Sequence, residues 1–260
     1  PQYFNTKKKL GFSKKMQPDI KAIVVKEGNR NIINEAFRVL RSNMDFMANK
    51  DNKQNVFVIT SFNPGSGKSF LSMNIAMSFA IKKKRILVID GDLRHGSISS
   101  YVDSPQTGLS DYLGNRVDNY KDIIVEDKKY DNLHIIPIGT VPPNPTELLE
   151  NGKLAILIKV LGSEYDYIFI DCPPIDIVAD TQIIEKLADR TIFVIRSGLL
   201  DRSMLPELEC IYQEKRFKNL SVILNGTESA GGRYGYHYGY RYGYHNGYSS
   251  YYGNGNRDGK

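Results

Sequence analysis

Short apolar runs rich in β-branched residues recur along the chain, and stretches with helical periodicity separate them. Nearly continuous apolar strands are typical of sheets covered on both faces, and strands that alternate with helices form parallel sheets. We therefore predict an α/β fold in which helices lie on both faces of a parallel sheet. The predicted strands are residues 56–59, 85–89, 133–136, 167–170, 191–195 and 222–224, and the predicted helices lie near residues 34–47, 68–82, 151–162, 179–188 and 203–215.

A glycine-rich loop follows the first predicted strand and leads into a predicted helix. This arrangement directs backbone N–H groups and the positive end of a helix toward an anion. Lys68 is then placed to reach the β- and γ-phosphates of a nucleotide, and the Ser69 hydroxyl to bind Mg²⁺. Phe62 occupies the first position of the usual G-x-x-x-x-G-K-[ST] string, so the match is partial, and an ordinary turn is the alternative. The predicted nucleotide-binding residues of the loop are Pro64, Gly65, Ser66, Gly67, Lys68, Ser69 and Phe70.

Carboxylates follow two further predicted strands. Asp90 and Asp92 come directly after one strand, with Arg94 available to offset their charge, and Asp171 comes after another. Parallel sheets bind ligands beyond the carboxyl ends of their strands, so we expect these groups beside the glycine-rich loop. Buried carboxylates are costly unless a cation or a proton transfer uses them. Each element alone has a plainer interpretation, a turn or a helix cap, but the three in this order favour a nucleotide site.

Taken together, these motifs resemble those of the bacterial protein-tyrosine kinases called BY-kinases. The segment 61–69 resembles their Walker A motif, and Asp171-Cys172-Pro173-Pro174 resembles their Walker B motif. The resemblance covers roughly residues 23–252 and implies a P-loop NTPase-like catalytic domain. In this family that domain is usually the cytoplasmic end of a membrane protein that controls capsule or exopolysaccharide chain length. Further matches are Asp90-x-Asp92-x-Arg94, Glu35-x-x-Arg38-x-x-Arg41, Pro142-Pro143-Asn144-Pro145-x-Glu147-Leu148-Leu149, Asp180 and Asn225.

The resemblance implies roles for the residues of the site, with ATP and Mg²⁺ as cofactors. Asp90 is the expected base that accepts the proton of a tyrosine, because a phenol with a pKa near 10 is mostly protonated at neutral pH. Asp92 and Asp171 are expected to bind Mg²⁺ together with Ser69, while Lys68 offsets charge on the phosphates. Spacing alone does not separate Asp90 from Asp92, so these two residues could exchange roles.

Three positions complete the comparison with the family. Asn225 resembles the residue that reads adenine, and its alternative role is that of a turn-forming residue before a glycine. Ser66 stands where the family often has Glu, and Cys172 where it usually has Ser or Thr. Neither departure removes a charge on metal or phosphate, so we expect both to tune activity rather than abolish it.

The tyrosines are concentrated in a segment with almost no aliphatic residues, 231–260, which we predict to be disordered because it cannot offset its ordering entropy by burial. Many of them recur at every second position, so an extended chain would present them on one side. The resemblance implies that they accept phosphate. We thus predict a basic arm over 1–30, a kinase domain over 31–230 and this tail. The predicted acceptors are Tyr234, Tyr236, Tyr238, Tyr240, Tyr242, Tyr244, Tyr248, Tyr251 and Tyr252.

The net charge of +6 is unevenly distributed. Residues 1–53 hold 12 Lys or Arg and 5 Asp or Glu, residues 231–260 hold 4 and 1, and the middle holds 19 and 23. Each phosphotyrosine adds about −1.5 to −2 charge, so a few would make the tail negative. An extended chain from Asn225 to Tyr252 reaches about 90 Å. We hypothesise that the unmodified tail enters the acidic site of a neighbouring subunit and that phosphorylation releases it.

Glu35, Arg38 and Arg41 are spaced to lie on one side of a helix. They could form charged contacts with another subunit, and in the family this motif builds a ring-like homo-oligomer. The alternative is a solvated helix face with a weak internal pair between Glu35 and Arg38.

The two cysteines, Cys172 and Cys210, cannot build a disulfide framework, which favours a reducing compartment. No apolar run approaches the roughly 18–20 residues that span a bilayer, and no signal peptide is visible. By resemblance we expect the cytoplasmic face of the bacterial inner membrane, with a transmembrane activator segment upstream in the same chain or in a partner. The basic arm would suit an anionic membrane surface, although a solvated leader is the simpler interpretation.

Two other functions compete with a kinase. A partition or septum-positioning ATPase has a similar deviant P-loop, but it usually carries a signature lysine where this chain has Asn63, and it lacks a tyrosine tail. A nucleic-acid-binding tail would stack tyrosines on bases and contact phosphates with arginines. This tail holds few cations, so we expect no nucleic-acid partner, while protein substrates other than the chain itself stay open.

Overall fold

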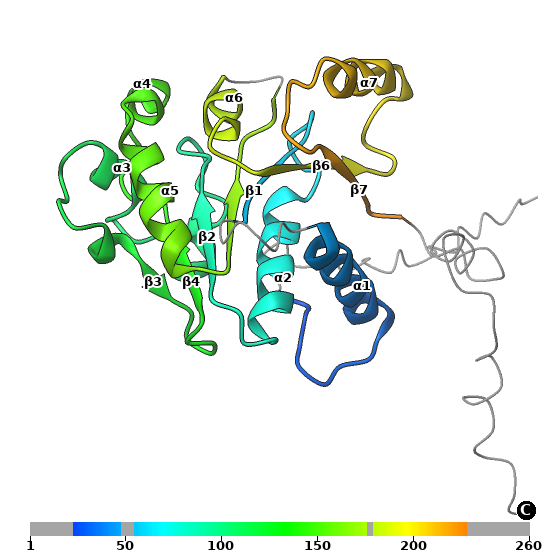
Figure 1. Ribbon diagram of the computed structural model, residues 1–260, viewed down its shortest axis with the longest axis horizontal. Helices are drawn as coiled ribbons and strands as arrows, with labels where there is room; N and C mark the ends of the chain where they lie inside the picture. Colours follow the sequence, from blue (N-terminus) through cyan, green and yellow to red (C-terminus); the bar gives the residue numbers. More distant parts are fainter. Residues whose placement is uncertain (1–22, 48–54, 176–178, 228–260) are drawn as a thin grey trace, which may run out of the picture. The chain divides into compact units, whose positions relative to one another are not determined.

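The strands of the computed structural model, which describes residues 23–47, 55–175 and 179–227, form one sheet (Figure 1). Within these residues the sheet has seven strands in the order β3-β4-β2-β5-β1-β6-β7. Every pairing is parallel except that of β3 with β4. The strands are β1 Val56–Thr60, β2 Ile86–Asp90, β3 Val125–Glu126, β4 Leu133–Ile136, β5 Tyr167–Asp171, β6 Arg190–Arg196 and β7 Ser221–Asn225.

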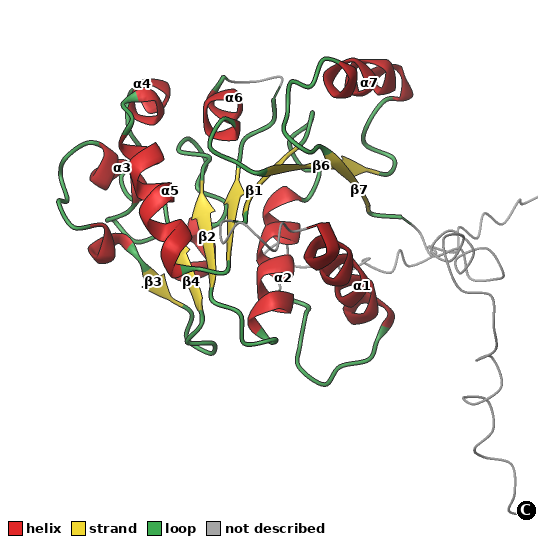
Figure 2. Cartoon of the chain, viewed as in Figure 1, coloured by secondary structure: helices red, strands yellow, loops and turns green. Residues whose placement is uncertain are grey.

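Helices lie on both sides of the strands (Figure 2). Alternate side chains of β1 show why: Phe57 and Ile59 pack against α1 and α2, whereas Val56 and Val58 pack on the side of α5. Both faces of the strand are buried, as its continuous apolar run predicts. The predicted α/β class is therefore confirmed. The helices are α1 Ile32–Met47, α2 Lys68–Ala80, α3 Leu109–Leu113, α4 Pro145–Glu150, α5 Lys153–Glu164, α6 Asp180–Glu185 and α7 Leu205–Gln213, with 3₁₀ turns at Ser99–Val102, Tyr120–Ile123 and Arg202–Met204.

Residues 23–30 are the described part of the predicted basic arm, and they differ from that prediction because they pack on the fold. Val25 is buried, and the backbone N–H groups of Val24 and Val25 donate to Asn74 Oδ1 of α2, at 2.8 and 3.2 Å. Asn34 Oδ1 accepts from the N–H of Lys26 at 2.8 Å. Buried backbone donors need such partners, so these two asparagines attach the segment to α1 and α2.

Asn31 and Asn34, at the start of α1, have different structural roles. Asn31 Oδ1 accepts from the backbone N–H of Asn34 at 2.9 Å, so Asn31 caps the helix and α1 begins at Ile32. Asn34 lies inside the helix and is buried. The remaining differences from prediction are short elements that periodicity cannot reveal, namely β3, α3 and α4.

Stability should depend on α1 through its buried face. Met44 has no exposed surface, whereas Phe46, two residues later, is 89% exposed. We expect Met44→Ala to lower the free energy of unfolding by about 2–5 kcal/mol, because a buried side chain leaves a cavity. Phe46→Ala should change it by less than about 0.5 kcal/mol. Urea unfolding of both variants measures the difference, and equal losses would contradict the packing of α1 described here.

Candidate active site

The glycine-rich loop between β1 and α2 has the geometry of a phosphate-binding loop. Gly65 and Gly67 have φ angles of 74° and 93°, and α2 begins at Lys68, directly after the loop. A Cβ atom at position 67 would lie 2.3 Å from Asn225 Nδ2, so only glycine fits there. Phe62, at the position where the usual motif has its first glycine, is buried and packs edge-on against Phe193 of β6, with ring centroids 4.8 Å apart.

Asp171, at the end of β5, is held by residues of α2. Its Oδ2 accepts from the Ser69 hydroxyl at 2.5 Å, and its Oδ1 accepts from the Ser72 hydroxyl at 3.1 Å. Burial raises the pKa of Asp171 to about 6, against the opposing effects of the Ser69 hydrogen bond and the Lys68 charge. Burial also lowers the pKa of Lys68, and Asp171 opposes that change. The predicted metal ligands Ser69 and Asp171 are therefore in direct contact.

Asp90, at the end of β2, has no exposed surface. Its Oδ2 accepts two hydrogen bonds from Ser99, one from the backbone N–H and one from the hydroxyl, both 2.7 Å long. Its buried Oδ1 has no hydrogen-bond partner in the described part of the chain. Asp90 pairs in register with Asp171 of β5. Burial, followed by the nearby Asp171 charge, raises the pKa of Asp90 to about 7.

Asp92 lies farther along the same turn and retains a small exposed surface, 8% of its total. Its Oδ1 accepts from the backbone N–H groups of Arg94 and His95, both at 3.2 Å. Gly91 separates the two carboxylates, and its N–H donates to the carbonyl oxygen of Asp171 at 2.8 Å. The turn therefore places both predicted carboxylates at the end of β5, with Asp90 buried and Asp92 closer to the surface.

Arg94 does not contact the carboxylates of its own motif with its side chain. Its Nε donates to Asp180 Oδ2 at 3.2 Å, and an amino group of its guanidinium donates to Thr146 Oγ1 at 3.2 Å. Asp180 is fully buried and also accepts from the Thr146 hydroxyl, at 2.8 Å. Thr146 lies within the Pro142–Leu149 segment, so two further matches to the family motifs meet at one arginine.

Strand ends on the other side of the loop also contact it. Asn225, at the end of β7, donates from Nδ2 to the carbonyl oxygen of Ser66 at 2.9 Å. Arg196, at the end of β6, donates from its guanidinium to the carbonyl oxygen of Gly65 at 2.7 Å. Inside the loop, the hydroxyls of Ser61 and Ser66 both donate to the carbonyl oxygen of Asn63, at 2.8 Å.

The donor set fits a nucleotide with a hard cation. Mg²⁺ prefers oxygen ligands and is usually held by one or two carboxylates with substrate phosphates supplying further ligands. The Ser69 hydroxyl and the carboxylates of Asp92 and Asp171 provide such oxygens, and Lys68 stands at the start of α2. Among the described residues there is no cluster of three or more His, Cys, Asp or Glu side chains arranged for a metal. Phosphate oxygens of a bound nucleotide would supply further ligands to such a cation.

Comparison with known proteins agrees with this geometry. A family model described as an AAA domain matches residues 54–203. Tyrosine-protein kinase CpsD of Streptococcus agalactiae serotype III is 36% identical over 203 residues, which cover 77% of this chain and 85% of CpsD. Tyrosine-protein kinase YwqD of Bacillus subtilis is 31% identical over 210 residues, covering 80% of this chain and 87% of YwqD. The chain belongs to the bacterial tyrosine-protein kinases, the BY-kinases.

Solved structures of BY-kinase domains have the same fold. The kinase domain of Escherichia coli tyrosine kinase ETK matches with a TM-score of 0.69 and 32% identity, covering 78% of this chain and 80% of that chain. The chimerical protein CapA2B2 matches with a TM-score of 0.70 and 32% identity, covering 78% and 88%. The septum site-determining protein MinD of Pyrococcus horikoshii is more distant, at a TM-score of 0.54 and 24% identity, with coverage of 65% and 69%. MinD and this BY-kinase share a P-loop NTPase-like fold, and the predicted fold class is thus confirmed.

The residues predicted for the oligomer interface make internal contacts. Arg38 pairs with Glu35 on the same helix and also donates to the carbonyl oxygen of Asn29 at 2.6 Å. Arg41 donates to the carbonyl oxygen of Ser78 of α2 at 2.7 Å. The internal pair considered as the alternative is therefore present, and a ring interface stays a prediction. The nine predicted acceptor tyrosines, Tyr234 to Tyr252, lie outside the described residues.

Three residues of this BY-kinase site were not predicted from the sequence. Ser72 follows Ser69 by three residues on α2, a helical spacing that could have identified it. Arg196 stands at a strand end, like the carboxylates, and the same rule could have found it. Ser99 lies in a 3₁₀ turn, and no sequence motif predicts its contact with Asp90.

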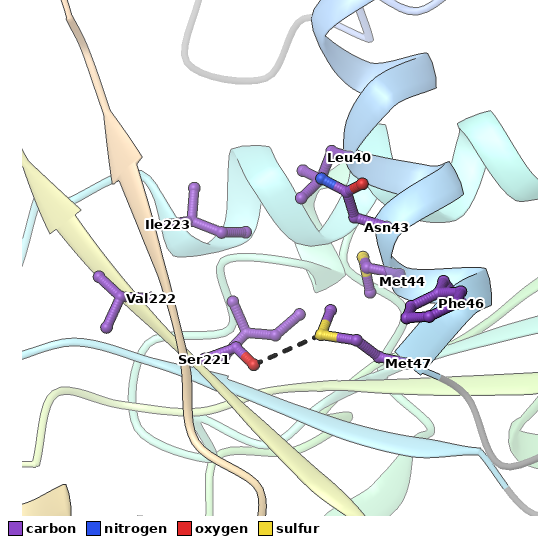
Figure 3. Close-up of a pocket in the computed structure, with 9 residues that line it drawn as sticks. Leu40, Asn43, Met44, Phe46, Met47, Ser221, Val222 and Ile223 are labelled. Atoms are coloured by element: carbon purple, nitrogen blue, oxygen red, sulfur yellow. Dashed lines mark hydrogen bonds between the residues drawn. The ribbon is translucent and has the colours of Figure 1, made fainter. Parts of the chain in front are cut away.

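A separate hollow of about 400 Å³ lies between α1 and the edge strand β7 (Figure 3). Its lining includes Leu40, Met47 and Ile223 and no residue of the phosphate loop, so it is not part of the nucleotide site.

In the part of the chain that the structure describes, no helix is both long and apolar enough to cross a bilayer.

The buried Asp90 should make the metal-free protein sensitive to pH. Because the folded state raises its pKa to about 7 from an ordinary 3.8, the stability that protonated Asp90 contributes is fully present below pH 3.8 and is lost as the pH rises through 7. Asp90→Asn should therefore raise the free energy of unfolding by roughly 4 kcal/mol at pH 8 and by roughly 2 kcal/mol at pH 5, where the carboxyl of the unfolded chain is already ionised. The measurement is urea unfolding in chelator at both pH values.

Asp118→Asn is the matched control, because Asp118 is an exposed carboxylate outside the site. It should leave the stability unchanged at both pH values. A destabilised Asp90→Asn protein at pH 8 would contradict the assignment of a costly buried charge to Asp90.

Proposed function

We propose that this BY-kinase transfers the γ-phosphoryl group of ATP to tyrosine hydroxyls of its own C-terminal tail. The observation that carries the proposal is the pairing of two buried carboxylates, Asp90 and Asp171, beside a phosphate loop whose Ser69 contacts one of them. Phosphoryl transfer depends mainly on positioning and charge stabilisation, and this arrangement supplies both.

Asp90 is the proposed base. Its Oδ2 is held by Ser99, which leaves Oδ1 as the oxygen that receives the phenolic proton. As the tyrosine oxygen forms its bond to the γ-phosphorus, the bond to the β,γ-bridging oxygen breaks, ADP leaves and the proton passes to Asp90. A base works best with a pKa near the working pH, and burial raises the pKa of Asp90 to about 7.

The remaining groups bind the nucleotide and its metal. Ser69, Asp92 and Asp171 would hold Mg²⁺, and Lys68 would reach the phosphates. Bound Mg²⁺ supplies neutralisation of the charge that develops on phosphate oxygens. Arg94 supports the site indirectly, because its guanidinium is held by Asp180 and Thr146 rather than by the carboxylates.

The tail tyrosines are the proposed acceptors, and transfer is proposed to occur between subunits of a ring-like homo-oligomer. The relatives CpsD and YwqD are named tyrosine-protein kinases, which supports this substrate class. We further propose a role in capsular or exopolysaccharide synthesis at the cytoplasmic face of the inner membrane, together with a transmembrane activator in the same chain or in a partner.

Loss of the phosphate-loop lysine should abolish the activity. We expect Lys68→Met to reduce phosphotyrosine at least 100-fold, because the amine that offsets phosphate charge is missing. The assay is incubation with Mg-ATP followed by intact mass, in which each phosphate adds one mass increment. Lys82→Met, which removes an exposed lysine in the turn that follows α2, should retain full phosphorylation. Undiminished phosphotyrosine in folded Lys68→Met protein would refute the proposal.

The kinetics of two variants should distinguish the roles of Asp90 and Asp92. Asp90→Asn should lower kcat by about 100-fold or more while the affinity for Mg-ADP is retained, since a base acts only in the reaction. Asp92→Asn should instead raise the Mg²⁺ concentration needed for half-maximal activity. If the two variants show the opposite pattern, Asp92 is the base and Asp90 supports the metal.

Transfer between subunits is tested by mixing two inactive partners. A variant with all nine tail tyrosines changed to Phe keeps the catalytic residues but has no acceptors, and Lys68→Met keeps the acceptors but cannot transfer. The mixture should form phosphotyrosine on the Lys68→Met chain at a rate that rises with the concentration of the Phe variant. Phosphorylation of wild-type chains at a concentration-independent rate, with none in the mixture, would show transfer within one subunit.

A further inference from the structure

Two strand-end side chains hold successive carbonyl groups of the phosphate loop from outside. Arg196 at the end of β6 donates to the carbonyl oxygen of Gly65 at 2.7 Å, and Asn225 at the end of β7 donates to that of Ser66 at 2.9 Å. Arg196 and Asn225 are themselves paired in register in the parallel sheet. Their contacts with adjacent peptide groups therefore arise from one rigid feature, the end of the β6–β7 ladder.

Anchoring a carbonyl oxygen also sets the direction of an N–H group. A trans peptide unit is planar, and its N–H points away from its C=O. The carbonyl of Gly65 shares a unit with the N–H of Ser66, and the carbonyl of Ser66 shares one with the N–H of Gly67. Within the described residues, neither N–H donates to another protein group. With both carbonyl oxygens held on the outside, both N–H groups are directed to the inner side of the loop.

This orientation would otherwise be easy to lose. Gly65 has a φ angle of 74° and no Cβ, so its backbone torsions are weakly restrained and do not by themselves fix the direction of the peptide group that follows. A turned peptide would present a carbonyl oxygen to a phosphate in place of a donor. The clash that excludes a side chain at Gly67 comes from Asn225 itself, so glycine at that position is what lets Asn225 reach the loop.

We propose that Arg196 and Asn225 are positioning residues that form a phosphate-loop clamp, fixing the Ser66 and Gly67 N–H groups toward the phosphates of the nucleotide. The clamp gives Arg196 a function that no motif assigns. It also gives Asn225 a second role, distinct from reading adenine. The inference rests on the nucleotide-binding part of the proposed function and does not depend on which hydroxyl accepts the phosphate.

The test compares ligands with and without a base. The affinity for Mg-ADP is measured by calorimetry, and that for inorganic tripolyphosphate by displacement of ADP. Arg196→Met, which keeps most of the stem but loses the donors and charge, should weaken both ligands about tenfold. Arg196→Lys should recover affinity to within about threefold, because an ammonium can still donate to the Gly65 carbonyl. Arg190→Met, at the opposite end of β6, is the control and should bind both ligands like the wild type.

Asn225→Ala separates the clamp from base recognition. The clamp predicts that this variant weakens tripolyphosphate, which has no base, about tenfold. Adenine recognition alone would lower the preference for ADP over GDP and leave the tripolyphosphate affinity unchanged. The double variant Arg196→Met, Asn225→Ala should lose less than the product of the single losses, because both residues act on one loop. Unchanged tripolyphosphate affinity in both single variants would overturn the clamp.

Hydrogen exchange provides a readout that needs no nucleotide. In nucleotide-free protein, the peptide covering residues 62–70 should exchange faster in Arg196→Met than in the wild type and in Arg190→Met. An identical exchange rate in all three proteins would overturn the proposal. Phosphotyrosine is measured on the same wild-type sample. Its absence, combined with the predicted shifts in affinity and exchange, would refute the proposed phosphorylation of the tail and support the clamp.

Discussion

The parallel pairing of β2 with β5 is the constraint on which the site depends. It places Asp90 in register with Asp171, so two carboxylates lie side by side in a core that leaves them almost no exposed surface. Burial raises the pKa of both groups, and such a pair is retained only where hydroxyls, an amine or a cation offset the charge. Ser99, Ser69 and Ser72 provide the hydroxyls, and Gly91 lets the two strand ends approach.

Much of this arrangement could be predicted because its signals are local. Strands β1, β2 and β5 read as continuous apolar runs, and the residue that follows or ends each one belongs to a motif. The rule that parallel strands present their carboxyl ends on one edge then brings those motifs together without knowledge of the strand order. The order itself, in which β5 lies between β1 and β2, is a tertiary property that no local pattern encodes.

The features that escaped prediction depend on partners distant in the sequence or on elements too short to show a period. Arg94 was expected to offset neighbouring carboxylates, yet it contacts Asp180, 86 positions away. The segment before α1 looked like a solvated arm because lysines dominate its composition, whereas in its described part, residues 23–30, the backbone N–H groups of Val24 and Val25 donate to a buried asparagine of α2. Helices of five or six residues, such as α3 and α4, span too few turns for an apolar face to be recognised.

The end of β7 also acts as a fixed origin for the segment that follows it. Tyr234 comes nine residues after Asn225 and Tyr252 comes twenty-seven after it. Whatever conformation the intervening chain adopts, its contour length limits the first tyrosine to about 30 Å from that strand end and the last to about 90 Å. Successive tyrosines are therefore attached to the end of β7 by chain segments of increasing length. Under the proposed transfer between subunits, the distance from the end of β7 to the active site of the neighbouring subunit decides how many of these tyrosines can reach it.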